Sequence, residues 1–258
     1  MIRSNFLLAI SFLAGGCALG WPIFASSESI ATWQQYSGPT LSLILLPIAL
    51  ALIASDLLSH QLNTRTLALV GILTALAVAV RPLGAGVAGI EPMWAVFIIA
   101  GRALGAHIGF VLGVTAMLTS GFVTGAIGPW LPYQMLLAAM IGAGAGLLPK
   151  FSGRSEVVML TAYAAITAFL LGWFLNLWFW PNTSGLQAGL GFNALANPLE
   201  RISAWINFSL ISSAGFDIPR SILTATLVGL SASQLLKVIR RFTRQVQVIH
   251  SVEQERAQ

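Results

Sequence analysis

Eight apolar stretches separated by short polar segments limit what this chain can fold into. Several approach the roughly 20 residues that an α-helix needs to cross about 30 Å of hydrocarbon. Charged residues are 8% of the chain and apolar residues 57%, whereas about a quarter of a soluble domain is charged. The sequence therefore predicts an all-α polytopic membrane protein. The expected crossings are 6–24, 38–55, 65–81, 92–104, 106–123, 132–149, 157–180 and 217–237.

Basic residues and tryptophans separate when these stretches are threaded alternately through a bilayer. One face receives every basic residue except Arg81, Arg201 and Arg220. By the positive-inside bias this face is cytoplasmic, so both termini are expected in the cytoplasm of a multi-pass plasma-membrane protein. All eight tryptophans fall toward the outer face, which predicts an aromatic cavity open to the outside.

The fourth and the first apolar stretches have distinctive flanking residues. The fourth is bounded closely by Glu91 and Arg102, so we expect a short or tilted helix whose arginine extends toward the headgroups. The first has an alternative interpretation as a cleaved signal peptide, because Arg3 precedes it and small residues follow it at 25–27. The topology of the later stretches is the same in either case.

Small residues recur at four-residue spacing, which places them on one helix face where backbones can approach closely. Most such stripes serve internal packing, and we expect at most one to be intermolecular. The three stripes are Gly71, Ala75 and Ala79; Gly105, Gly109 and Gly113; and Gly142 with Gly146.

Motifs for several enzyme classes are missing from the sequence. It contains no phosphate-binding loop of the Walker type, no G-x-S-x-G elbow and no H-E-x-x-H pair. Its histidines are scattered, so no metal site, cofactor or catalytic activity is expected. The net charge of +5 follows from the cytoplasmic excess of basic residues beside anionic lipid, and requires no nucleic acid.

Candidate solute-binding residues concentrate on the expected outer face. The segment 128–135 presents an indole, a phenol and an amide on a turn stiffened by two prolines, and this combination suits a ring-bearing solute. Trp173, Asn176 and Trp180 lie about one turn apart on the seventh crossing. The expected contacts with the solute are Arg81, Glu91, Trp94, Trp130, Tyr133, Gln134, Trp173, Asn176 and Trp180.

Two outer features have alternative interpretations. Arg81 and Glu91 bracket the glycine-rich turn 82–90; they either pair with each other or with headgroups, or form the charged rim of the pocket. The long segment 181–217 contains a helix-like piece at 199–211. It is either a lid over the cavity or a helix lying in the membrane interface.

Four segments, 76–84 (LAVAVRPLG), 91–93 (EPM), 100–105 (AGRALG) and 128–135 (GPWLPYQM), are similar to one family. Residues 63–245 resemble the substrate-binding S components of energy-coupling-factor vitamin transporters. The resemblance implies a six-helix binding core at 63–245. The two transmembrane helices expected at 1–62 depart from the family's minimal pattern and resemble an N-terminal extension, and a cytoplasmic tail is expected at 246–258. The 128–135 segment is most similar to S components linked to cobalamin or its precursors.

The resemblance also implies partners. S components capture a vitamin from outside and assemble with a transmembrane coupling protein and two cytoplasmic ATPase subunits. Family members dock the coupling protein through an Ala-x-x-x-Ala face on the first core helix, and Ala75 and Ala79 match it here. This implies that the stripe with Gly71 is the intermolecular one.

Two other functions remain open from the sequence. One is a stand-alone secondary transporter, although no crossing carries the mid-membrane acidic or histidine chain of proton-driven carriers. The other is an intramembrane enzyme or assembly factor acting on a lipid-linked substrate. Its candidate acids, Glu91, Glu200 and Asp217, are expected to lie in separate loops.

Overall fold

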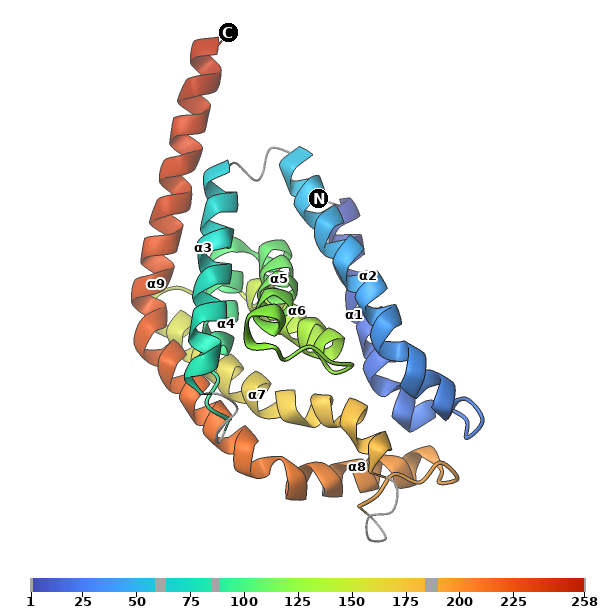
Figure 1. Cartoon of the computed structure of the whole chain (residues 1–258). Coiled ribbons are helices and arrows are strands. Elements are labelled where there is room, and N and C mark those ends of the chain that lie inside the picture. Colours follow the sequence, from blue (N-terminus) through green and yellow to red (C-terminus); the bar gives the residue numbers. More distant parts are fainter. Residues whose placement is uncertain (1, 59–63, 85–88, 184–189, 258) are drawn as a thin grey trace.

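The computed structural model describes residues 2–58, 64–84, 89–183 and 190–257. Over these residues the chain forms helices and no strand (Figure 1). The α-helices are α1 (Ile2–Phe24), α2 (Ile30–Leu58), α3 (Thr64–Val80), α4 (Met93–Leu104), α5 (Ala106–Thr124), α6 (Leu131–Leu147), α7 (Gly153–Phe179), α8 (Pro198–Ser212) and α9 (Ala214–Ala257). Two short 3₁₀ helices, η1 (Arg81–Leu83) and η3 (Trp180–Asn182), continue α3 and α7.

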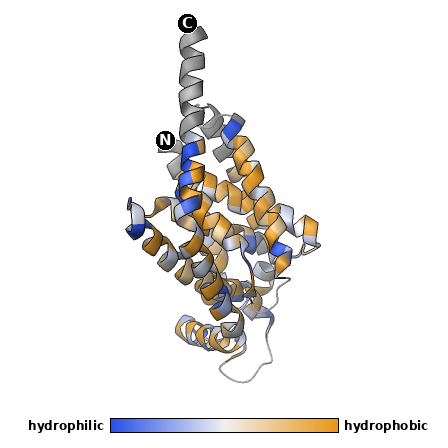
Figure 2. Ribbon diagram, turned by 90° about the vertical axis from the view of Figure 1, so that its left-hand side faces the viewer, coloured by the Kyte–Doolittle hydropathy of each residue, from blue (hydrophilic) through white to orange (hydrophobic). Residues whose placement is uncertain are grey.

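Four segments of the described residues are long and apolar enough to cross a membrane, namely Arg65–Leu83, Ala106–Thr124, Gly153–Asn182 and Ala214–Thr243. Shorter apolar helices cover Leu8–Phe24, Pro39–Ala51, Met93–Leu104 and Leu131–Leu147. Hydrophobic residues predominate along the helices of the bundle (Figure 2). The predicted all-helical architecture is therefore confirmed, and these apolar helices are compatible with insertion into a membrane.

Helix α4 lies at the centre of the bundle, where it contacts α3, α5, α6, α7 and α9. Its 12 residues extend about 18 Å at 1.5 Å per residue. Most of its side chains, from Met93 to Ala100, are buried. Because neighbouring helices surround it, α4 can be short and still belong to an apolar bundle.

Arg102 ends the short helix α4 in a buried polar cluster. Its Nε lies 2.6 Å from Oε1 of Glu156, and the two side chains are 7% and 5% exposed. Its other nitrogens donate to the carbonyl oxygens of Leu148 and Pro149. Arg240 of α9 also donates to both oxygens of Glu156. We call the end of the bundle where α4 finishes the Arg102 end. The opposite end of the bundle, where α4 begins, is the Arg81 end.

Glycines bring α5 and α6 into backbone contact. A Cβ at Gly109 would lie 2.3 Å from the carbonyl oxygen of Gly142, and one at Gly113 would lie 2.4 Å from the carbonyl carbon of Ala138. A Cβ at Gly146 would similarly meet Ala106. These contacts assign the Gly109–Gly113 and Gly142–Gly146 stripes to internal packing.

The stripe on α3 has a different environment. Gly71, Ala75 and Ala79 are all exposed, and a Cβ at Gly71 would meet nothing within 4 Å. Large apolar neighbours on α3, such as Ile72 and Leu76, are exposed as well. Helix α3 therefore presents an uncovered apolar face.

Helix α8 is joined to the end of α1 by side-chain hydrogen bonds. Arg201 is buried and donates to the carbonyl oxygens of Pro22, Ile23 and Ala25. A capping box between Asn197 and Glu200 defines the start of the helix. The predicted helix-like piece at 199–211 is therefore a real helix, although it contributes no side chain to the cavity described below.

Candidate functional site

A cavity of about 600 Å³ opens at the Arg81 end, among η1, the turn before α4, the end of α5 and the start of α6. It combines charged and polar groups with apolar walls, as small-molecule sites commonly do. Its lining residues are Arg81, Pro82, Glu91, Val123, Thr124, Ala126, Trp130 and Gln134. Four of the residues expected to bind a solute, Arg81, Glu91, Trp130 and Gln134, thus lie around one space.

The Arg81 guanidinium is oriented by neutral groups from two helices. Its Nη1 donates to Ser120 Oγ of α5, and its Nη2 donates to Gln134 Oε1 of α6 at 3.2 Å. The Ser120 hydroxyl in turn donates to the carbonyl oxygen of Met117 at 2.8 Å. These hydrogen bonds fix the guanidinium at the cavity wall without neutralising its charge.

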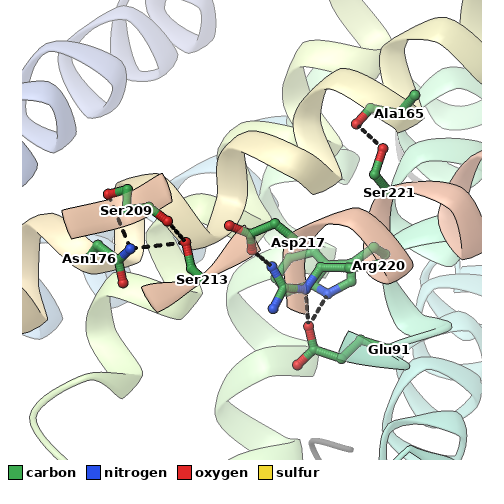
Figure 3. Close-up of polar contacts among 9 residues, drawn as sticks. Glu91, Ala165, Asn176, Ser209, Ser213, Asp217, Arg220 and Ser221 are labelled. Carbon is green, nitrogen blue, oxygen red and sulfur yellow. Dashed lines mark hydrogen bonds and ion pairs between the residues drawn. The ribbon is translucent and has the colours of Figure 1, made fainter. Parts of the chain in front are cut away.

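Glu91 forms its ion pair with Arg220 of α9 rather than with Arg81, so the alternative in which Arg81 and Glu91 pair with each other is wrong, and both residues line the cavity. Glu91 Oε2 accepts from Arg220 Nε at 2.8 Å and from Trp94 Nε1 at 2.9 Å. Arg220 Nη1 also donates to Asp217 Oδ1 at 2.6 Å (Figure 3). One arginine therefore joins two carboxylates, and Trp94 supports the site from behind the cavity lining.

Asp217 does not lie in a separate loop, as the sequence suggested, but in the first turn of α9. It is fully buried, against α7 at Gly172, where a Cβ would lie 1.9 Å from Asp217 Oδ1. The missing side chain of Gly172 therefore makes room for the carboxylate. Its i, i+3 spacing from Arg220 was the available sequence signal for this ion pair.

Gly89 explains how the turn before α4 reaches α9. It has φ 72°, a backbone conformation that favours glycine. A Cβ there would lie 2.0 Å from the carbonyl oxygen of Phe216. This close approach carries Glu91 to Arg220.

The two aromatic residues of the 128–135 segment have separate roles. Trp130 is 37% exposed and lines the cavity, with its ring edge-on to Trp178 at 6.0 Å. Tyr133 is fully buried and lies 6.1 Å from the same ring. Trp130 can therefore contact a solute in the cavity, whereas Tyr133 packs behind it.

The remaining expected contacts lie in α7 and η3 and pack against α8 or the segment that precedes it. Asn176 donates to the hydroxyls of Ser209 and Ser213, both at 3.1 Å (Figure 3). The carbonyl oxygen of Trp173 accepts from Trp205 Nε1 at 3.1 Å. Trp180 is buried against Phe192. None of Trp173, Asn176 and Trp180 lines the cavity.

The tryptophans do not form an aromatic cage around this cavity, because Trp130 alone among them lines it. Trp21 and Trp33 stack on each other between α1 and α2 at 6.2 Å. Trp173 and Trp205 are in edge-on contact at 6.0 Å. The tryptophans thus belong to several separate packing clusters.

Among the described residues, no group of three or more His, Cys, Asp or Glu side chains could hold a metal ion. The cavity lining itself offers a guanidinium, a carboxylate, an amide and an indole.

Comparison with protein-family models, with curated proteins and with solved structures finds no match to this chain.

Proposed function

We propose that the protein is the membrane-embedded substrate-binding subunit of an energy-coupling-factor importer for a water-soluble vitamin. The observation that carries this proposal is the convergence of three of the four segments that resemble S components, whereas the fourth, 100–105, lies at the Arg102 end. Arg81 and Pro82 of 76–84, Glu91 of 91–93, and Trp130 and Gln134 of 128–135 all line one cavity. Residues of one binding site would match the same family's pattern even where they are far apart in the sequence, so this convergence supports the resemblance.

The cavity suits a small water-soluble molecule. Its volume of about 600 Å³ lies within the range typical of sites for drug-sized ligands. Other cavities, of about 410 Å³ between α1 and α2 and about 210 Å³ beside Tyr163, have no charged residue in their lining. A complete corrinoid is much larger than a drug-sized ligand, so a smaller vitamin is favoured over cobalamin.

The proposed architecture places two transmembrane helices at 1–62, the six-helix binding core at 63–245 and a cytoplasmic tail at 246–258. Helix α9 continues without a break across this last boundary. We place the Arg81 end outside the cell and both termini in the cytoplasm. The exposed basic residues Lys150, Arg154 and Arg241 then lie on the cytoplasmic side.

The proposed docking face for the coupling protein is Gly71, Ala75 and Ala79 on α3. Its exposure supports this choice, because the α5 and α6 stripes are already filled by each other. A partner helix could approach α3 closely along these small side chains. The two ATPase subunits would act through that coupling protein.

Binding to the purified protein tests the proposal. Trp130→Ala should weaken binding of the vitamin about thirtyfold, because truncating a central aromatic in a desolvated site costs about 2 kcal/mol. Trp33→Ala is the matched control, since Trp33 is 41% exposed but lies on α2. The measurements are native mass spectrometry for a retained solute and titration with a vitamin panel. Equal affinity in the folded Trp130→Ala protein would remove the cavity as the binding site.

A stand-alone secondary transporter is the second candidate. Buried Asp217 and its partner Arg220 favour it, because ionisable residues within membrane helices often mark ion pathways. Uptake into vesicles driven by a proton gradient alone would support this candidate, whereas dependence on a coupling protein and ATP would support the importer.

A further inference from the structure

We infer that the solute of the Arg81 cavity carries a carboxylate or another planar oxyanion, which binds the Arg81 guanidinium. This inference rests on the proposed function, and it narrows the vitamins to those with an acidic group.

Arg81 differs from the other buried or half-buried arginines among the described residues. Arg102 and Arg240 share Glu156, and Arg220 is paired with Asp217 and Glu91. Arg201 is surrounded by backbone carbonyl oxygens. For Arg81, the hydrogen-bond acceptors within the described part of the chain are a hydroxyl and an amide oxygen. A half-buried cation whose hydrogen-bond acceptors are all neutral gains charge-assisted hydrogen bonds when a ligand places an anion beside it.

The carboxylate in the cavity wall does not supply that anion directly. Glu91 Oε2 is bound by Arg220 Nε at 2.8 Å and by Trp94 Nε1 at 2.9 Å. The ion pair with Arg220 turns the Glu91 carboxylate toward α9 (Figure 3), so Glu91 attracts Arg81 only through space and without a hydrogen bond. Asp217, the second acid of this group, is fully buried and does not line the cavity.

The surroundings of Arg81 fit the two parts of an acidic vitamin. A guanidinium presents several N–H groups in a planar fork that matches a carboxylate in a bidentate manner. Ser120 and Gln134 already fix the plane of this fork. Trp130, Val123 and the ring of Pro82 provide apolar area for the rest of the molecule. The geometry thus provides an anion site beside an apolar wall.

Comparing acidic vitamins with their neutral analogues tests whether the solute binds through a carboxylate. The probes are biotin with biotin amide, pantothenate with pantothenol, and nicotinate with nicotinamide, together with riboflavin and thiamine, which carry no carboxylate. One acid should bind the purified protein at least about tenfold more tightly than its neutral partner, as expected for hydrogen bonds to a charged group. Arg81→Gln should abolish this preference, and Arg81→Lys should keep part of it because it retains the charge without the fork. Arg154→Gln, an exposed arginine at the Arg102 end, should leave binding unchanged.

The outcomes separate this inference from the proposed function. Tight binding of riboflavin or thiamine that Arg81→Gln leaves unchanged would overturn the inference and support a vitamin-binding subunit. A retained solute without an acidic group in native mass spectrometry would do the same. If the natural protein neither binds any probe nor retains any solute, both the carboxylate inference and the proposed vitamin-binding function would be overturned. The comparison of acid with neutral partner uses the natural sequence, so it stands even if Arg81→Gln does not fold.

Discussion

Among single residues, Glu156 stands out because its one carboxylate forms ion pairs with two arginines from different helices. Arg102 at the end of α4 and Arg240 in α9 both lie 2.6 Å from its Oε1. Breaking a buried ion pair by removing one partner is costly, because it leaves an uncompensated charge in an apolar environment. Glu156 is therefore expected to stabilise the Arg102 end of the bundle.

Glu156→Gln should lower the free energy of unfolding by about 3 kcal/mol, the lower end of the range for removing one partner of a buried pair. The lower end applies because Arg102 keeps two carbonyl acceptors and Arg240 is partly exposed. Thermal unfolding in detergent measures the change. Glu28→Gln makes the same chemical substitution at an exposed position and should change the unfolding temperature little. Equal unfolding temperatures for the two variants would show that the ion pairs add nothing to stability.

At the scale of elements, stripes with the same spacing have opposite surroundings. Along α5, Gly109 and Gly113 touch the backbone of α6, whereas along α3 the small residues remain uncovered. Spacing alone cannot distinguish these cases, because it specifies a helix face but not what packs against that face.

Substitutions in the two stripes should therefore have different effects. Gly113→Leu should abolish folded, monodisperse protein in detergent, because its Cβ alone would overlap the backbone of Ala138 and Ala139. Ala75→Leu, on the exposed face of α3, should leave folding and solute binding nearly unchanged. If α3 docks the coupling protein, Ala75→Leu should abolish ATP-dependent uptake. Loss of binding together with uptake would instead assign Ala75 to internal packing, and unchanged uptake would place the docking face elsewhere.

At the scale of the whole molecule, two polar groups lie at opposite ends of central helix α4. Glu91 with Arg220 is at one end, and Arg102 with Glu156 is at the other. Exposed basic residues such as Lys150, Arg154 and Arg241 add charge at the Arg102 end. This polarity is the basis for the proposed orientation in the membrane.

Single-cysteine labelling tests that orientation. In a Cys17→Ala background, which removes the one natural cysteine, Ser27→Cys should react with an impermeant maleimide in intact cells. Arg154→Cys should react only after permeabilisation. Both positions are exposed, so failure to react reports sidedness rather than burial. Labelling at position 154 in intact cells would reverse the orientation and place the Arg81 cavity in the cytoplasm.

Local features were readable from the sequence because they depend on neighbouring residues. The apolar stretch expected at 106–123 is α5 (Ala106–Thr124), and the one expected at 132–149 is α6 (Leu131–Leu147). Runs of apolar residues and the glycines and prolines that interrupt them specify such segments directly. The same local reasoning singled out Arg81, Glu91, Trp130 and Gln134, which the structure brings to one cavity.

Tertiary structure alone decided which of these residues meet. Glu91 binds Arg220, 129 positions later in the chain, rather than nearby Arg81, because Gly89 lets the turn before α4 approach α9. Asn176 faces α8 instead of the cavity for a similar reason, since helical spacing gives its face on α7 but not the helix opposite. Composition and apolar runs were enough to predict an apolar, all-helical chain and the polar groups available to a site. Packing between distant helices determined which of those groups share a cavity, because such contacts depend on the positions of both partners at once.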